Sequence, residues 1–345
     1  MYSTRSFMPT AHLNRYLVAG SLKQETILPY NRPPILNQLG GSLLYAASGI
    51  GLWDTGISLL SRIGVNFPAE WLARLSTLGW DISGIKQLSE TLEHRSFTAY
   101  EDIETLSTST PLELFSAAGL PFPKDFIGFL PHSENLDSRT TPTPSTLKAS
   151  DVPADYLDAT AAHLCPLDFL SHSLLPPVLR RGNLTTITIE PGSAYMHPIF
   201  FDSMKDLLGG ITAFLPSETC ALNLFRQRST DLTEISEQLA GWGCGIVVIQ
   251  RANRGCLVYD HQSHSRWIIP AYPSPVVDIT GASDSFCGGF LAGYRQTYDP
   301  LEAALYATIS RSFCVESSNP AYNLGVMPQL AQARLESLRG LVRKL

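Results

Sequence analysis

Several features are scarce or missing in the sequence, and each absence excludes a class of protein. The six cysteines are scattered over 345 residues without a C-x-x-C pair, which argues against a zinc site or a disulfide framework. No run of about 18 apolar residues occurs, so we expect no membrane span. The first 16 residues lack the continuous apolar core of a secretion signal, and we therefore expect a cytoplasmic protein.

Basic residues are not in excess either. The formal net charge of −6 argues against a broad nucleic-acid surface, although it allows an anionic nucleotide in one locally positive pocket. No G-x-G-x-x-G motif follows the first apolar segment, which disfavours a dehydrogenase with a dinucleotide fold. Hydrophobic residues make up 44% of the chain and charged residues 16%, so there is enough apolar material for a substantial core.

Short apolar segments alternate with segments of helical periodicity along most of the chain. This alternation predicts a mainly parallel sheet covered by helices on both faces. The predicted strands are 16–20, 56–64, 161–165, 185–191, 210–215 and 245–250. The predicted helices are 68–78, 174–179, 201–208, 231–243, a helix that begins at Leu301, and a terminal helix over 327–345. Residues 254–270 are an exception and predict two short strands around a polar turn.

The stretch DITGASDSFCGGFLAGY, residues 278–294, places small residues where a loop turns into a helix. Phe286, Phe290 and Tyr294 recur at intervals of four and mark one helix face. Backbone N–H groups at a helix start lack partners and carry partial positive charge, so this turn is suited to bind a phosphate. Asp284 would repel that phosphate, which makes sense if it removes a proton from an attacking hydroxyl group. The alternative is a glycine-rich helix start with Asp284 as a capping acid.

This stretch resembles the second signature, D-T-x-G-A-G-D-x-F, of the PfkB-type, ribokinase-like carbohydrate kinases. The resemblance implies that Asp284 is the catalytic base. It also implies that Gly281, Ala282 and Ser283 form an anion hole over the transferred phosphoryl group. Ser283 replaces the usual third glycine, and it keeps the N–H group while narrowing the permitted backbone angles.

A second resemblance lies in Gly40-Gly41, which precede an apolar helical pattern, as in the first signature of the same family. Paired glycines let a ligand or a second backbone come close. The resemblance implies that Glu25, Gly40, Gly41 and Tyr45 contact the substrate. Glu25 replaces the family's aspartate and Tyr45 its asparagine, so we do not infer ribose as the substrate. Tyr45 either stacks on a substrate ring or fills core space.

The segments that handle metal ions in the family differ here. Its N-x-x-E motif, whose glutamate organises the magnesium ion (Mg²⁺), corresponds to Ser217 and Cys220, and a thiol cannot replace that acid. Glu218 is a weak candidate substitute. In several members of the family, the positions of Asp278 and Thr280 coordinate a monovalent cation such as potassium (K⁺). Alternatively, Asp278 ties the loop to its neighbours.

The resemblance also implies nucleotide contacts, and they are only partly matched. Gln250 and Gly255 lie in the segment that corresponds to the family's T-x-G-x-x-G motif, of which only the last glycine is kept. Ser317 and Asn319 lie where a loop at the edge of the nucleotide is expected. The helix that begins at Leu301 resembles the wall of the family's adenine pocket.

Together these patterns predict an α/β chain with a ribokinase-like three-layer α/β/α sandwich, a mainly parallel sheet and a small β lid. We expect one domain over residues 1–345, with lid strands at about 20–38 and 92–103. Residues 105–153 are rich in Ser, Thr and Pro and predict a long irregular excursion. This excursion could serve as a substrate cover, as an oligomer contact in a homodimer, or as a mobile loop.

The resemblance implies transfer of the γ-phosphoryl group of ATP, with Mg²⁺, to a hydroxymethyl group of a sugar or sugar-like small molecule. We expect neither nucleic acid nor membrane as a partner. One alternative is a nucleoside kinase of the same fold, which would use the same Asp284. The other is a non-catalytic nucleotide- or sugar-binding relative, an alternative that the changes at Cys220 and Ser283 motivate.

Overall fold

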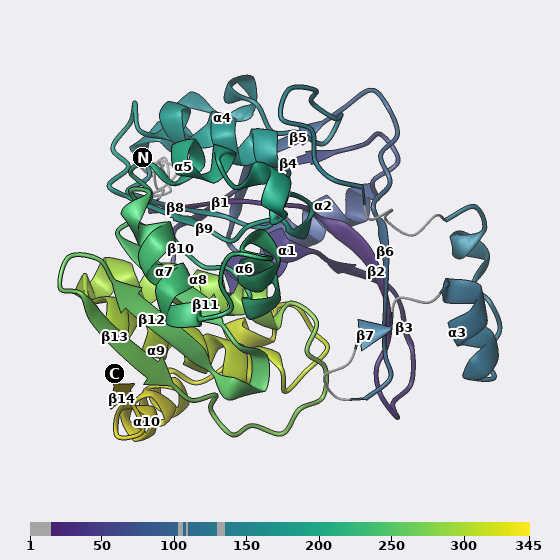
Figure 1. Cartoon of the computed structure of the whole chain (residues 1–345). Coiled ribbons are helices and arrows are strands. Elements are labelled where there is room, and N and C mark those ends of the chain that lie inside the picture. Colours follow the sequence, from purple (N-terminus) through teal and green to yellow (C-terminus); the bar gives the residue numbers. More distant parts are fainter. Residues whose placement is uncertain (1–14, 103–105, 108–109, 130–134) are drawn as a thin grey trace, which may run out of the picture.

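Two sheets organise the residues that the computed structural model describes, 15–102, 106–107, 110–129 and 135–345 (Figure 1). From edge to edge, the larger sheet contains β14 (Arg343–Lys344), β13 (Ser265–Ile269), β12 (Cys256–Asp260), β11 (Ile246–Gln250), β10 (Ala213–Phe214), β9 (Thr186–Ile189), β8 (Ala161–Leu164), β1 (Tyr16–Ala19), β4 (Ile57–Ile63) and β5 (Asp81–Gln87). The strands from β11 to β5 are parallel, and β12, β13 and β14 pair antiparallel. The predicted mainly parallel sheet is confirmed.

Helices cover both faces of this sheet (Figure 1). One face packs against α4 (Phe169–Leu179), α5 (Ser203–Leu208), α6 (Glu218–Leu224) and α7 (Leu232–Gly241). The other face packs against α1 (Ser42–Gly51), α2 (Ala69–Thr77), α8 (Ala282–Thr297), α9 (Pro300–Cys314) and α10 (Pro328–Arg339). The central strands β1, β8, β9 and β11 are buried along their whole length, as expected for parallel strands between two helical layers. The predicted three-layer α/β/α fold is therefore confirmed.

A smaller sheet forms beside the main one, in the order β3 (Ile35–Gly40), β2 (Lys23–Leu28), β6 (Arg95–Tyr100) and β7 (Leu106–Ser107). β2 and β3 are an antiparallel hairpin, and β6 adds to β2 in parallel. β2 lies within the first predicted lid segment and β6 within the second, whereas β3 extends two residues past the first segment and β7 follows the second. Residue 103, the predicted end of that segment, lies outside the described residues.

The predicted irregular excursion is partly helical, and the prediction is wrong for α3 (Pro111–Ala117). In Figure 1 this helix lies on the outer side of the lid. Phe115 and Phe126 contact Phe97 of β6, with ring centroids 5.8 and 6.0 Å apart, so a small aromatic cluster attaches the segment to the lid. Residues 105, 108–109 and 130–134 of the excursion lie outside the described residues.

The end of the excursion is attached to the main sheet. Asp151 accepts hydrogen bonds from Arg62 of β4 at 2.8 Å and from Lys86 of β5 at 2.8 Å. The Asp151 side chain is completely buried, and removal of both basic partners would leave a buried charge uncompensated. This segment is therefore anchored rather than loose.

The terminal helix is shorter than the sequence predicts. α10 ends at Arg339, and Arg343–Lys344 add to the sheet edge as β14. None of the helices within the described part of the chain is both long enough and apolar enough to span a bilayer.

Candidate active site

The first turn of α8 has the geometry of an anion-binding turn. Gly281 caps the helix with φ of 70°, and a Cβ there would lie 2.0 Å from Cγ of Tyr45, so both the backbone angle and the space require glycine. The Ala282 amide donates to Ile279 O at 3.1 Å and is therefore already engaged. The amides of Gly281 and Ser283 donate to no backbone carbonyl of the described residues. Two of the three predicted anion-hole amides are thus open to a ligand.

Asp284 follows directly in the same turn, where it is half-buried. Its Oδ1 is inaccessible to solvent and has no hydrogen-bond partner among the described residues. Burial raises the pKa of Asp284 well above its ordinary value, and the neighbouring carboxyl groups of Glu190 and Glu25 raise it further. An unengaged carboxyl group with a raised pKa beside a helix start is suited to take up a proton.

The residues of the first signature gather around one buried carboxyl group, that of Glu25 on β2. Glu25 Oε1 accepts from the Gly41 amide at 2.8 Å, and Oε2 accepts from the Tyr45 hydroxyl group at 2.9 Å. A Cβ at Gly40 would lie 2.1 Å from Glu25 Oε2, which explains the glycine there. Burial raises the pKa of Glu25 to about 7. The predicted contacts Glu25, Gly40, Gly41 and Tyr45 are thus neighbours, and the Tyr45 ring lies over Gly281 of the anion-hole turn.

The lid contacts the loop that leads into α8. The hydroxyl groups of Tyr100 on β6 and Thr280 are 2.9 Å apart, and Gln38 of β3 donates to Ser318 O at 2.7 Å. Asp278 Oδ1 accepts from the Thr280 amide at 2.9 Å, so Asp278 does tie the loop together. Its second oxygen, Oδ2, is buried and without a hydrogen-bond partner among the described residues.

The turn before α6, where the family has its N-x-x-E motif, is occupied by other interactions. Ser217 caps α6, and its hydroxyl group accepts from the Cys220 amide at 3.2 Å. Glu218 accepts a hydrogen bond from Arg254 and lies 3.7 Å from Arg251 Nε. Burial raises the pKa of the Cys220 thiol. The only carboxyl group of this turn is therefore neutralised by arginines rather than directed at a metal ion.

A cavity of about 370 Å³ lies between α9 and two loops. Its lining includes Asn253, Tyr272, Thr308 and Arg311, and it continues along residues 273–279. Of the predicted elements, the helix that begins near Leu301 contributes Thr308, Arg311 and Ser312 to this cavity, and the 278–294 stretch contributes Ile279. A second cavity, of about 410 Å³, lies under the tip of the lid and is lined by residues 29–33, Tyr100, Asp102 and 276–279.

The four predicted nucleotide contacts line neither cavity. Gln250 donates to Leu215 O at 3.1 Å and accepts from Ser283 Oγ at 3.0 Å, so it lies behind the anion-hole turn. Gly255 forms a tight turn with φ of 80°. In the loop that the lid contacts, the Asn319 amide donates to Ser317 Oγ at 3.1 Å.

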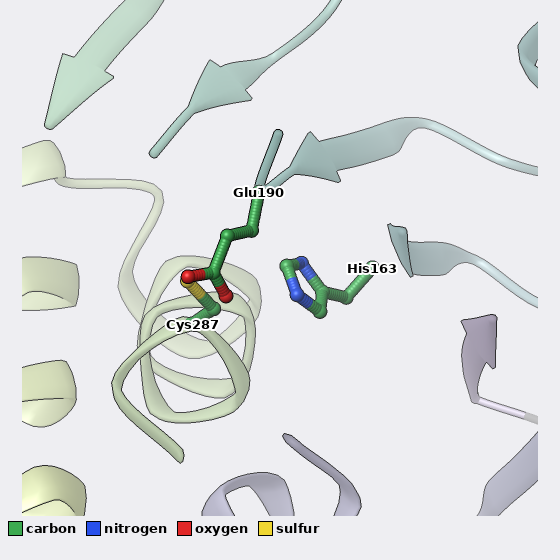
Figure 2. A group of neighbouring side chains, drawn as sticks. All are labelled: His163, Glu190 and Cys287. Atoms are coloured by element: carbon green, nitrogen blue, oxygen red, sulfur yellow. The ribbon is translucent and has the colours of Figure 1, made fainter. Parts of the chain in front are cut away.

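Sequence reasoning missed Glu190, which follows β9 and accepts a hydrogen bond from Ser283 Oγ. Burial is the main cause that raises its pKa. Its position directly after a buried strand was the available signal, because ligands of open α/β sheets bind outside the carboxyl ends of the strands. His163 and Cys287 lie beside it (Figure 2).

The fold is that of solved ribokinase-like structures. A nucleoside kinase of Burkholderia thailandensis, solved with inosine, has a TM-score of 0.67 at 17% identity and covers 94% of this chain and 99% of its own. An E. coli protein described as a Ribokinase II, solved with ATP and Mg²⁺, has a TM-score of 0.68 at 18% identity and covers 94% and 100%.

Sequence comparison finds relatives among the pfkB family carbohydrate kinases. Residues 189–325 match the model of the pfkB family carbohydrate kinases. A cytidine kinase of Thermococcus kodakarensis is 29% identical over 273 residues, which cover 79% of this chain and 86% of that kinase. The predicted resemblance to the PfkB-type, ribokinase-like kinases is confirmed, and these kinase relatives support a phosphotransferase.

Proposed function

We propose that this protein transfers the γ-phosphoryl group of ATP to the hydroxymethyl group of a nucleoside. The observation that carries this proposal is the unengaged carboxyl group of Asp284 beside the open amides of Gly281 and Ser283. A nucleoside is favoured over a free sugar because the relatives include a cytidine kinase and a nucleoside kinase solved with inosine. The cavity under the lid tip adds support, since Tyr30 and Tyr100 offer aromatic rings to a base.

In the proposed reaction, Asp284 accepts the proton of the hydroxymethyl group as the oxygen attacks phosphorus. The amides of Gly281 and Ser283 hold the charge that develops on the transferred phosphoryl oxygens. Glu25 orients the acceptor through hydrogen bonds to its hydroxyl groups. The cavity between α9 and the 271–279 loop receives the nucleotide, with Arg311 providing positive charge at its wall.

The described residues do not fit a magnesium ion held by a carboxylate at the family's position. Glu218 is paired with Arg254, and Cys220 offers a thiol, a poor ligand for Mg²⁺. We infer that Mg²⁺ enters with ATP, held by phosphate oxygens and water. Asp278 and Thr280 fit a potassium ion better, because Asp278 Oδ2 is a buried oxygen to which no described residue donates a hydrogen bond.

A free sugar is the second candidate acceptor. It is favoured by the description of the matching family as carbohydrate kinases and by the position of Tyr45. The Tyr45 ring lies over Gly281 and reduces the space above the anion-hole turn.

The test is a panel of nucleosides and free sugars, with acceptor-dependent release of ADP as the readout. The panel includes cytidine, adenosine and inosine beside ribose and fructose, each with and without added K⁺. We expect the highest kcat/KM with a nucleoside. A preference for a free sugar would replace the first candidate with the second. Nucleotide binding without turnover on any acceptor would instead support the non-catalytic alternative.

A further inference from the structure

Three buried side chains of different chemistry converge behind the anion-hole turn. His163 on β8, Glu190 after β9 and Cys287 on α8 each offer one ligand atom, and these atoms all lie within 4.8 Å of one another (Figure 2). The proposed reaction uses none of the three. Nitrogen, oxygen and sulfur donors that meet at one point are uncommon in an apolar core, so the group requires a physical explanation.

Two of the three groups lack the partners that buried polar atoms normally have. His163 Nε2 and Glu190 Oε2 are inaccessible to solvent and make no hydrogen bond to any described residue. A polar atom left unpaired in the interior destabilises the fold, because its lost hydration is not replaced. A cation bound between them would satisfy both atoms.

The hydrogen bonds of His163 orient its ring for such a role. His163 Nδ1 lies 2.9 Å from Thr188 Oγ1, and the Thr188 hydroxyl group donates its own proton to Ala162 O at 3.4 Å. This arrangement favours a ring proton on Nδ1, and in that tautomer the Nε2 lone pair is directed at Glu190 and Cys287 (Figure 2). Burial lowers the pKa of His163 to about 3, so the ring is neutral at physiological pH. A neutral imidazole fixed by a hydrogen bond on its other nitrogen is the usual form of a metal-binding histidine.

We propose that His163, Glu190 and Cys287 form a binding site for a divalent transition-metal ion of the Zn²⁺ type. Imidazole, carboxylate and thiolate are the donors that Zn²⁺ prefers, whereas Mg²⁺ requires oxygen ligands. Zn²⁺ bonds of about 2.0 to 2.3 Å require ligand atoms roughly 3 to 4 Å apart, so the three side chains close in slightly on binding. The Cys287 thiol releases its proton to solvent as its sulfur bonds to the metal ion.

The position of the site determines what the ion does. It joins β8 and β9 to α8, one helical turn beyond Ser283, whose hydroxyl group donates to the same Glu190. The ion therefore fixes the helix whose first turn forms the anion hole. This inference is independent of the acceptor that the protein phosphorylates.

The test uses full-length protein freed of metal by a chelator and then titrated with Co²⁺ and, separately, with Zn²⁺. We expect one equivalent of Co²⁺ with a thiolate-to-cobalt charge-transfer absorption band, and a higher Tm with Zn²⁺. Cys287→Ala should abolish the band. Its matched control is Cys244→Ala, which removes another buried thiol, outside the site, and should retain the band.

Thr188→Val provides a second, milder variant that keeps the side-chain volume. Loss of the hydroxyl group that orients His163 should weaken Zn²⁺ binding by about 10-fold to 100-fold. Circular dichroism establishes that each variant is folded. The proposal is refuted if wild-type protein shows no charge-transfer band at stoichiometric Co²⁺. It is equally refuted if Cys287→Ala retains that band.

Discussion

Two turns differ sharply in how well they match the motifs of the PfkB-type kinases. Residues 278–284 lead into and begin α8, and residues 215–220 lead into and begin α6. The first keeps the small residues and the acid, with Gly281 packed against Tyr45 and Asp284 Oδ1 without a hydrogen-bond partner among the described residues. The second lacks the metal-organising acid, and Glu218 is paired with Arg254. The proposed base and anion hole depend on one carboxyl group and one backbone conformation, and the chain has both in Asp284 and Gly281. A magnesium ion can take oxygen ligands from phosphates and water, so its binding depends less on the protein. The turn into α6, which corresponds to the N-x-x-E motif, is where the chain departs from the family's pattern.

The largest effect is expected at the first turn. Asp284→Asn removes the proton acceptor while it preserves shape, and kcat should fall by roughly two to four powers of ten. Nucleotide affinity should stay nearly unchanged because the amides of the turn remain. Steady-state ADP release and a nucleotide-binding titration measure the two quantities. Retention of kcat within about threefold would remove Asp284 from the mechanism.

The next largest effect is expected on the pH dependence of stability, through the buried carboxyl group of Glu25 beside that turn. The pKa of Glu25 rises from 4.5 when unfolded to about 7 when folded, so the folded state binds the proton more tightly between these values. The free energy of unfolding should therefore fall as pH rises from about 4.5 to 7, by on the order of 3 kcal/mol from this group. Urea denaturation at several pH values, with Glu25→Gln as the comparison, measures it. An equal slope in the variant would contradict the assignment.

A smaller effect, on the Mg²⁺ requirement, is expected from substitution of Cys220 in the turn into α6. Cys220→Glu restores an oxygen ligand where the family has one, and it should lower the Mg²⁺ concentration for half-maximal activity by about tenfold. Cys220→Ser has no carboxylate and serves as the control. If Cys220→Glu leaves the Mg²⁺ requirement unchanged, this turn does not face the metal in the reacting complex.

The smallest effect is expected from Glu218→Gln. Because Glu218 is already neutralised by Arg254, its charge should contribute little to metal handling, and kcat should change by less than about threefold. The measurement is the Mg²⁺ dependence of ADP release. A loss of more than tenfold would show that Glu218 leaves the arginines during turnover and replaces the missing acid.

Much of the fold could be predicted because the central strands are short buried apolar runs, and helices follow several of them. The turn into α8 was predictable for a different reason, since its small residues, Asp284 and the helix face are contiguous. Helix α3 was missed because the surrounding Ser, Thr and Pro residues favour irregular structure, whereas packing of Phe115 on the lid supports a helix.

The rest of the site depends on contacts between distant residues. His163, Glu190 and Cys287 come from three separate elements, and no sequence spacing brings them together. Gln250 was expected at the nucleotide, yet it lies behind Ser283 because β11 ends beneath α8. Such placements follow from the order of strands in the sheet, which the local pattern does not specify.

The pH dependence of kcat in the wild type and in Asp284→Asn tests the central claim most directly, namely that Asp284 accepts the proton of the acceptor. The wild-type kcat should fall about tenfold per pH unit on the acid side. The midpoint should lie above the ordinary pKa of an aspartate, because burial and Glu190 raise it. The small residual rate of Asp284→Asn should lack this decline. The same acid-side decline in both proteins would contradict the account.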